Sequence, residues 1–174
     1  MKAVLISIQP KWCELIANGE KTVEVRKTRP KLDVPFKCYI YCTKSKKTYE
    51  SFAVSGKPYE CGGKVIGEFV CDRIDYVRNY GDMVDSYDCI ASCLSANEII
   101  EYAKDKNGNF VYTYGWHISN LVIYDKPKEL SEFCRYDNTY DNAFGYAFED
   151  RNKYIPITRP FQSWGYVEGK EDEK

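Results

Sequence analysis

The stretch 7–26 constrains the fold more than any other part of the chain. Pro10 suits the first turn of a helix, where its missing N–H would have no partner. The apolar side chains that follow it recur at the spacing of one helix face: Trp12, Leu15 and Ile16. Gly19 suits the left-handed position that closes a helix, and over 22–26 apolar and polar residues alternate as they do in a strand. The stretch therefore predicts a short helix, a glycine stop and a strand.

This strand carries ionisable groups on one face. Glu24 and Arg26 are two residues apart and share that face, opposite the valines that flank Glu24. Lys21, at the turn before the strand, can reach the same place. An ion pair among these groups would only order the turn. In an enzyme, a Lys21 with a lowered pKa would act as base or nucleophile while Glu24 shuttles the proton. The sequence leaves both interpretations open.

Glu68 stands alone in the most apolar segment of the chain, 64–72, which predicts a central strand. A carboxylate that is buried without a partner is costly, so Glu68 must face a cation or a polar cavity. Pairing with Arg26 or Lys21 is one interpretation. Contact with a ligand is the other.

Further strands are predicted where apolar and aromatic residues cluster or alternate: 3–8, 36–43, 110–114, 116–124 and 155–167. Ser95, followed three residues later by Glu98, forms a capping box that predicts a helix over 95–104. Strands outnumber helices, and the two do not alternate regularly. This order favours an α+β, mostly β fold over a doubly wound sheet. We expect a mixed β-barrel flanked by two or three helices.

Charged residues make up 29% of the chain and aromatic residues 16%, as in soluble globular proteins. No apolar run approaches the roughly 18 residues that span a membrane, and the opening MKAVLI is too short for a signal peptide. We therefore expect a cytoplasmic protein with no membrane contact. One domain is expected over 1–168, and a disordered charged tail over 169–174. The oligomeric state is left open.

The charge is distributed unevenly along the chain, although its net value is only −1. Residues 1–70 hold 13 Lys and Arg against 7 Asp and Glu, a net of +6. Residues 71–174 hold 12 against 19, a net of −7. The asymmetry indicates either a basic face built from the first half or an ordinary surface with uneven charge.

Eight cysteines raise the question of disulfides or zinc. Without a secretory signal, free and mostly buried thiols are expected. Cys38 and Cys42 have a zinc-like spacing, but on a strand they would be about 13 Å apart, too far for one ion. His117 is the only histidine. We expect no metal and no cofactor.

Two segments, one near each end of the sequence, resemble motifs of one protein family. Four residues occupy the fixed positions of its opening motif: Gly19, Lys21, Glu24 and Arg26. This motif resembles the start of ASCH domains, which are relatives of the PUA fold. The segment 158–167, TRPFQSWGYV, resembles the Arg-Pro-Pro-Gln-Ser-Trp ending of small ASCH proteins of bacteria and their phages, with Phe161 in place of the second proline. The segment 114–119, followed by Pro127, resembles the strand and loop that close the barrel.

The resemblance implies a PUA-like pseudobarrel that acts on RNA, with the first helix beside a cleft. Aromatic rings stack on unpaired bases while Lys and Arg contact phosphates, and Gln and Ser side chains can bond base edges. We therefore expect RNA, a nucleoside or a nucleotide as the partner. The predicted ligand-binding residues are Trp12, Lys21, Glu24, Arg26, Glu68, Trp116, Arg159, Gln162, Ser163 and Trp164.

Three alternatives to a binding module stay open. Some small ASCH relatives are amidohydrolases that release acetyl from an acylated cytidine with a Lys, Thr and Glu set. Lys21 matches the lysine, but Glu24 occupies the threonine position. Other relatives resemble ribonucleases, which would need metal-binding carboxylates or a histidine. A protein adaptor that uses the acidic, tyrosine-rich second half of the chain, which includes the acidic segment 135–153, is the third alternative.

Overall fold

The computed structural model describes residues 1–44, 51–77, 79–80, 83–136 and 154–169. The strands are β1 (Lys2–Ile8), β2 (Val23–Arg26), β3 (Phe36–Cys42), β4 (Ser51–Val54), β5 (Lys57–Glu60), β6 (Val65–Tyr76), β7 (Asn79–Tyr80), β8 (Met83–Val84), β9 (Tyr114–Lys128), β10 (Cys134–Tyr136), β11 (Tyr154–Pro156) and β12 (Trp164–Glu168). The helices are α1 (Pro10–Ala17), α2 (Ser86–Ser92) and α3 (Ala96–Tyr102), with one 3-10 turn, η1 (Leu130–Glu132). None of the helices in these ranges has the length and apolar character that crossing a membrane requires.

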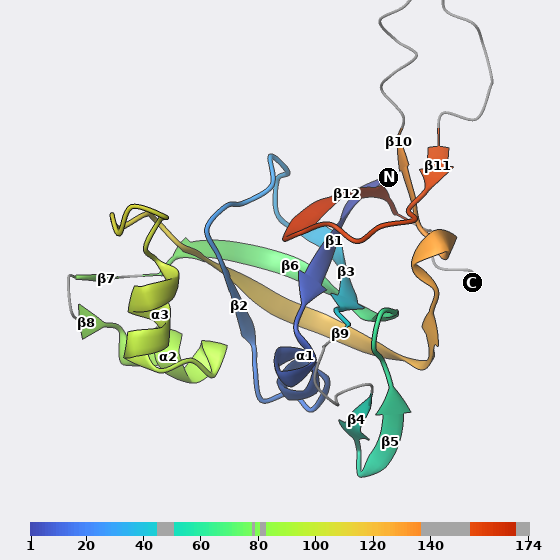
Figure 1. The fold of residues 1–174 in the computed structure, drawn as a ribbon, viewed down its shortest axis with the longest axis horizontal. Coiled ribbons are helices and arrows are strands. Elements are labelled where there is room, and N and C mark those ends of the chain that lie inside the picture. The colour runs from blue at the N-terminus through green and yellow to red at the C-terminus, as the bar shows by residue number, and fades with distance from the viewer. Residues whose placement is uncertain (45–50, 78, 81–82, 137–153, 170–174) are drawn as a thin grey trace, which may run out of the picture.

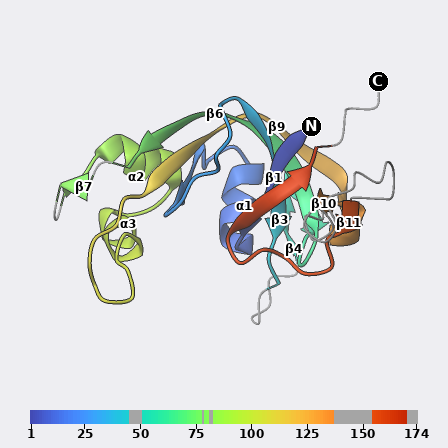
Figure 2. The ribbon, with the colours of Figure 1, turned by 90° about the horizontal axis from the view of Figure 1, so that it is seen from above.

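Six strands form the main sheet in the order β12-β1-β3-β6-β9-β2 (Figure 1). The β1–β3 pair is parallel and the other neighbours are antiparallel. The α+β, mostly β fold is therefore confirmed, and β6 occupies the central position that its apolar sequence predicts. Among the described strands the sheet is open, with β12 and β2 at its edges. Figure 2 shows that the sheet curves, with α1 beneath its concave side.

Both faces of the sheet are buried. Side chains of β1 and β3 alternate between two apolar clusters, because successive residues of a strand point to opposite faces. The cluster on the α1 side includes Val4, Ile6, Cys38, Ile40, Phe69 and Trp116. The cluster on the other face includes Leu5, Tyr39, Val65, Phe133 and Val167. All eight cysteines are free thiols, five of them buried, and burial raises the pKa of Cys71 to about 12.

The segment from Pro10 to β2 follows its local sequence signals. Pro10 is the first residue of α1, and the helix ends at Ala17. Gly19 then adopts a φ of +76°, the left-handed conformation that favours glycine. The chain turns there and enters β2, the edge strand that pairs with β9. The predicted helix, glycine stop and strand are confirmed.

The strand predicted over 116–124 is confirmed as part of β9, which extends from Tyr114 to Lys128. The separate strand predicted over 110–114 is wrong, because 111–113 are not in a strand and Phe110 forms only an isolated bridge with Lys104. Gly115, which lies between the two predicted segments, is inside β9 opposite Val25. A Cβ atom at this position would lie 2.9 Å from Val23 Cγ1, so the glycine permits close approach of β2 rather than ending the strand.

The C-terminal segment also differs from the single strand predicted over 155–167. Two strands, β11 and β12, occupy its ends, and the residues between them cross the end of β1. Ser7 fixes this crossing, since its N–H donates to Ser163 O at 2.8 Å and its hydroxyl donates to Phe161 O at 2.6 Å. Gly169 is buried beside Met1, while the rest of the expected tail, 170–174, lies outside the described residues. So do residues 137–153 of the acidic segment.

Helix α3 has the capping box that its sequence predicts. The Ser95 N–H and hydroxyl each donate to the Glu98 carboxylate at 2.8 Å, and the Glu98 N–H donates back to the Ser95 hydroxyl. These bonds lower the pKa of Glu98, because they favour its charged form. Helix α2, which no signal predicted, is capped by Asp85, whose side chain accepts from the Tyr87 N–H.

The lowered pKa of Glu98 makes its contribution to stability pH-dependent. A carboxyl group whose pKa falls on folding stabilises the protein above its unfolded pKa, near 4.5, and this contribution disappears as the pH falls through the folded value. We expect Glu98→Gln to lower the free energy of unfolding at pH 7 by less than about 1 kcal/mol, because the carboxylate is exposed and solvent screens its interactions. The difference should vanish below the folded pKa, as measured by urea unfolding across the pH range. Glu101→Gln, an exposed change on the same helix, is the control, and a loss for Glu98→Gln that persists at low pH would contradict the interpretation.

Candidate functional site

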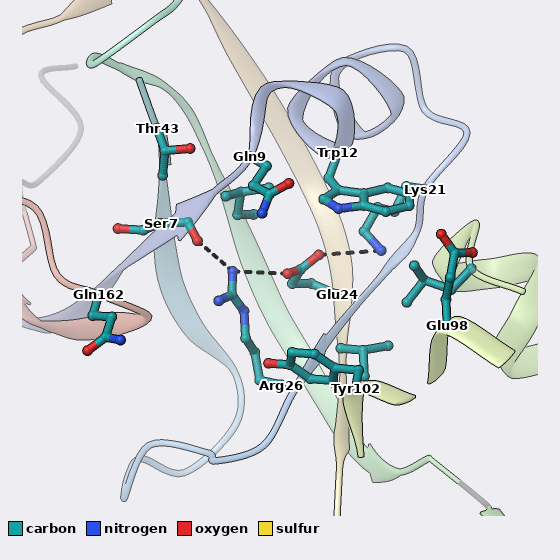
Figure 3. Close-up of a pocket in the computed structure, with 13 residues that line it drawn as sticks. Ser7, Gln9, Trp12, Lys21, Glu24, Arg26, Thr43, Glu98, Tyr102 and Gln162 are labelled. Carbon is teal, nitrogen blue, oxygen red and sulfur yellow. Dashed lines mark hydrogen bonds and ion pairs between the residues drawn. The ribbon is translucent and has the colours of Figure 1, made fainter. Parts of the chain in front are cut away.

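A pocket of about 450 Å³ opens between α1, β2, α3 and the residues that precede β12 (Figure 3). Its polar and aromatic lining combines residues from five separate parts of the chain: Ser7, Gln9, Trp12, Lys21, Glu24, Arg26, Thr43, Glu98, Tyr102 and Gln162. The polar side chains of β2 and of the turn before it form the floor of this pocket.

Glu24 is the anionic centre of the floor. Its Oε1 atom lies 3.0 Å from Arg26 Nη2, and its Oε2 atom lies 3.4 Å from Lys21 Nζ. All three side chains are largely buried. One carboxylate therefore holds two cations with its two oxygen atoms, as the dashed lines in Figure 3 show. The buried charges stabilise the site only as a set, because each would be costly alone.

The Lys21 amine is held by groups from three elements. It is 2% exposed, and it donates to the carbonyl of Ser92, the last residue of α2, at 2.6 Å. Its Nζ atom also lies 5.2 Å from the centre of the Trp12 ring, within the range of a cation–π contact. The carbonyls at a helix end lack intrahelical partners, so α2 supplies an acceptor suited to this cation.

Arg26 ties the pocket to the ends of two further strands. Its Nη2 atom donates to Ser7 O at 2.7 Å, and Nη1 donates to the Ser163 hydroxyl at 3.3 Å. Within the described residues, Nε is buried and has no hydrogen-bond partner. A buried donor without an acceptor costs free energy. A ligand oxygen or nitrogen that reached it would recover that cost.

Two aromatic side chains flank the charged floor. Trp12 from α1 and Tyr102 from α3 lie on opposite sides of Glu24 in the view of Figure 3. Partial burial raises the pKa of Tyr102 by more than the nearby Arg26 lowers it, so its hydroxyl stays protonated at neutral pH and can donate a hydrogen bond. The side-chain amides of Gln9 and Gln162 add donors and acceptors to the lining.

Five of the residues predicted to bind a ligand line this pocket: Trp12, Lys21, Glu24, Arg26 and Gln162. Ser163 joins them indirectly through its bond to Arg26. Arg159 is exposed and does not line the pocket. Trp116 and Trp164 are also outside the lining, and their rings contact each other at a centroid distance of 5.7 Å.

The two tryptophans of the motif segments pack rather than face the pocket. Trp116 is fully buried in the core, where its ring also meets Phe36. Its indole nitrogen is buried without a partner among the described residues. Trp164 is half-buried and donates from Nε1 to the Thr28 hydroxyl at 3.0 Å. Trp164 thereby fastens the β2–β3 loop to β12.

Glu68 pairs with neither Lys21 nor Arg26. It forms an ion pair with Lys37 Nζ at 2.9 Å and accepts a hydrogen bond from the Tyr124 hydroxyl. The antiparallel register explains this, because Glu68 lies opposite Tyr39 of β3, two residues from Lys37. The structure therefore separates Glu68 from the pocket charges.

Sequence reasoning did not assign Gln9, Glu98 or Tyr102 to the site. Glu98 and Tyr102 are four residues apart on α3 and therefore share a face, a spacing that marks one side of a helix. Nothing local shows that this side faces β2, because α3 follows β2 by about seventy residues in sequence. Among the described residues, no three His, Cys, Asp or Glu side chains are grouped so as to hold a metal ion.

Comparison with known proteins supports the motif evidence. A family model described as the ASCH domain matches residues 6–134. The crystal structure of ASCH from Zymomonas mobilis has a TM-score of 0.51 and 16% identity, and the match covers 95% of this chain and 87% of that one. A point mutant of the same protein also has a TM-score of 0.51, with 18% identity and coverage of 75% and 77%. No curated protein matches. At these identities the two structures establish likeness of fold.

The charged floor generates a stability prediction. Glu24→Gln would leave Lys21 and Arg26 buried without their shared anion, and we expect the free energy of unfolding to fall by about 3–5 kcal/mol. Urea unfolding measures this loss. Glu68→Gln is the matched control, since that carboxylate is also partly buried on a strand but its described ion pair is with one cation. An equal loss in the two variants would show that Glu24 has no special role.

Proposed function

The chain belongs to the ASCH domain family, and from that premise we propose that its pocket binds the base of an unpaired RNA nucleotide. The observation that carries the proposal is the convergence of the family's motif residues on one pocket of about 450 Å³. Ligand sites commonly fall between roughly 300 and 1,000 Å³ and combine aromatic walls with a few polar groups. A nucleobase fits this size and chemistry.

The balance of charge favours a base over a phosphate inside the pocket. Lys21 and Arg26 are cationic, while Glu24 and Glu98 are anionic, so these four lining side chains carry no net charge. A phosphate placed among them would meet the two carboxylates as well as the two cations. A neutral base instead offers ring edges that can bond with the amide of Gln162 and the hydroxyl of Tyr102.

Trp12 provides the face on which a base can stack. It is half-buried, so part of the indole is accessible from the pocket. Lys11 lies over the same ring, with Nζ at 4.3 Å from its centre. An aromatic face beside a lysine is the combination that holds single-stranded RNA in many proteins.

An amidohydrolase acting on an acylated nucleoside such as acetylcytidine is the second candidate function. One observation favours it: an amine and a carboxylate, Lys21 and Glu24, lie 3.4 Å apart on the floor of the pocket. Hydrolysis would require a neutral amine or a free carboxylate as the base for the attacking water. Here Lys21 already donates to Ser92 O, and the Glu24 carboxylate is shared between two cations. Binding without chemistry therefore accounts better for the arrangement.

A ribonuclease gains less support from the arrangement of the described residues. His117 does not line the pocket, and its Nε2 atom lies 3.0 Å from Asp75 Oδ2. In the β2–β9 register His117 lies opposite Val23, so its side chain projects to the face opposite Glu24.

We expect Trp12→Leu to weaken the binding of nucleoside monophosphates by roughly 5- to 150-fold, because base–aromatic stacking contributes about 1–3 kcal/mol. Leucine keeps an apolar group against the core while removing the ring. Gln162→Ala, at an exposed position of the lining, should weaken binding without changing the melting temperature. Isothermal titration with the four common monophosphates measures both effects.

Thr158→Ala is the control, since Thr158 is exposed in the same segment but does not line the pocket. Wild-type affinity in both pocket variants would contradict the proposed site. Incubation of the wild type with acetylcytidine, followed by chromatography, tests for deacetylation. A denaturing gel of labelled single-stranded RNA tests for cleavage. If the wild type forms product in either assay and a correctly folded Glu24→Gln variant does not, the function is catalysis rather than binding.

A further inference from the structure

A row of tyrosines leads away from the pocket across the sheet. Arg26 on β2 lies opposite Tyr114 on β9, and Tyr114 lies opposite Tyr76 on β6. Residues that are directly opposite in antiparallel strands project to the same face. Since Arg26 lines the pocket, Tyr114 and Tyr76 continue the pocket face over the neighbouring strands. Tyr112, just before β9, extends the line, and we name Tyr114, Tyr76 and Tyr112 the tyrosine row.

The rings of the row contact one another and become more exposed with distance from the pocket. The centroids of Tyr114 and Tyr76 are 5.2 Å apart, and those of Tyr76 and Tyr112 are 5.6 Å apart. Tyr114 is half-buried, whereas Tyr76 is 58% exposed and Tyr112 is 78% exposed. Tyrosines in contact and yet this exposed contribute little to the core, so their clustering indicates a binding surface.

Two exposed cations lie near these rings, one beside the pocket wall and one beside the row. Lys27 follows β2 directly, and its Nζ atom is 5.2 Å from the ring of Tyr102 in the pocket wall. The guanidinium carbon of Arg29 is 5.8 Å from the ring of Tyr114. The lining of the pocket has no net charge, so these cations are the groups that would meet a phosphate joining a base in the pocket to the next nucleotide.

The acidic residue nearest to the row along β6 is turned away from it. Asp75 precedes Tyr76, so its side chain projects to the opposite face of the sheet. There it pairs with Arg73 Nε at 2.9 Å and with His117 Nε2 at 3.0 Å. Asp75 therefore adds no negative charge to the face that carries the row.

We propose that the tyrosine row binds the bases that flank the pocket nucleotide in a single-stranded RNA, with Lys27 and Arg29 on the intervening phosphates. This inference rests on the proposed function and extends it from one nucleotide to a strand. Exposed rings accept stacking from any unpaired base, whereas paired bases have their faces occupied by their neighbours. The row therefore selects unpaired strands without strong sequence preference.

The test compares a strand with a single nucleotide. Anisotropy of a labelled, unstructured pyrimidine octanucleotide at fixed salt gives the affinity for a strand, and titration calorimetry with cytidine and uridine monophosphates gives the affinity of the pocket. Tyr112→Ala and Tyr76→Ala should each weaken octanucleotide binding by roughly 5- to 150-fold. Binding of the monophosphates should not change. Arg29→Gln should reduce the magnitude of the salt slope by about 0.7, the value for one phosphate contact on a single strand.

Tyr154→Ala is the matched control. Tyr154 is 48% exposed on β11, and Figure 1 shows β11 on the far side of the molecule from α3 and the adjoining ends of β6 and β9. Leucine variants of Tyr76 and Tyr112 keep apolar contacts without a ring, and they replace any alanine variant whose melting temperature falls.

The outcomes separate this inference from the proposed function. Weakened octanucleotide binding with unchanged monophosphate binding supports the row. Three results would each overturn it. The first is wild-type affinity for the octanucleotide in the row variants, and the second is an equal loss of affinity in Tyr154→Ala. The third is that the wild type binds the octanucleotide, a duplex of the same sequence and the monophosphates with equal affinity. If wild type binds monophosphates but the row variants match it on the octanucleotide, only this inference fails. If wild type binds neither probe, the proposed function fails as well.

Discussion

The Glu24 carboxylate determines how the N-terminal motif and the rest of the chain fit together. It neutralises Lys21 and Arg26 in a place where neither cation is well hydrated, and each cation then bonds to a different element. Lys21 reaches the end of α2, and Arg26 reaches β1 and the residues before β12. The position of the pocket walls thus depends on one anion shared between two cations. Removal of that anion would leave two buried cations without their shared partner, which is costly.

Local signals allowed much of the fold to be predicted. Pro10 starts α1 and Gly19 follows its end, and each acts through its own backbone conformation. The Ser95–Glu98 capping box acts within a single helical turn. The motif residues Lys21, Glu24 and Arg26 were predictable as one cluster for the same reason, since a turn and a short strand bring them together. The order of strands and helices and the ASCH resemblance predicted the fold class, which the family match over residues 6–134 and the sheet confirm.

The rest depends on contacts between distant segments. Glu68 meets Lys37 because of the β3–β6 register, which no local pattern determines. Gly115 looks like a strand break in sequence, but its role is to let Val23 of the neighbouring strand approach. Trp116 and Trp164 lie in comparable motif segments, yet one is core and the other fastens a loop. Tyr102 lines the pocket only because the tertiary fold places α3 beside β2.

The bond between Arg26 and Ser163 joins residues that are 137 positions apart, and that between Lys21 and Ser92 spans 71. During translation at ~5–20 residues per second, Ser163 is added to the chain on the order of ten seconds after Arg26. The motif is therefore synthesised well before the segments that complete its contacts. Until β12 and the residues before it have left the ribosome, the pocket lacks the Gln162 side chain and the bond from Arg26 to Ser163, so one of its walls is missing.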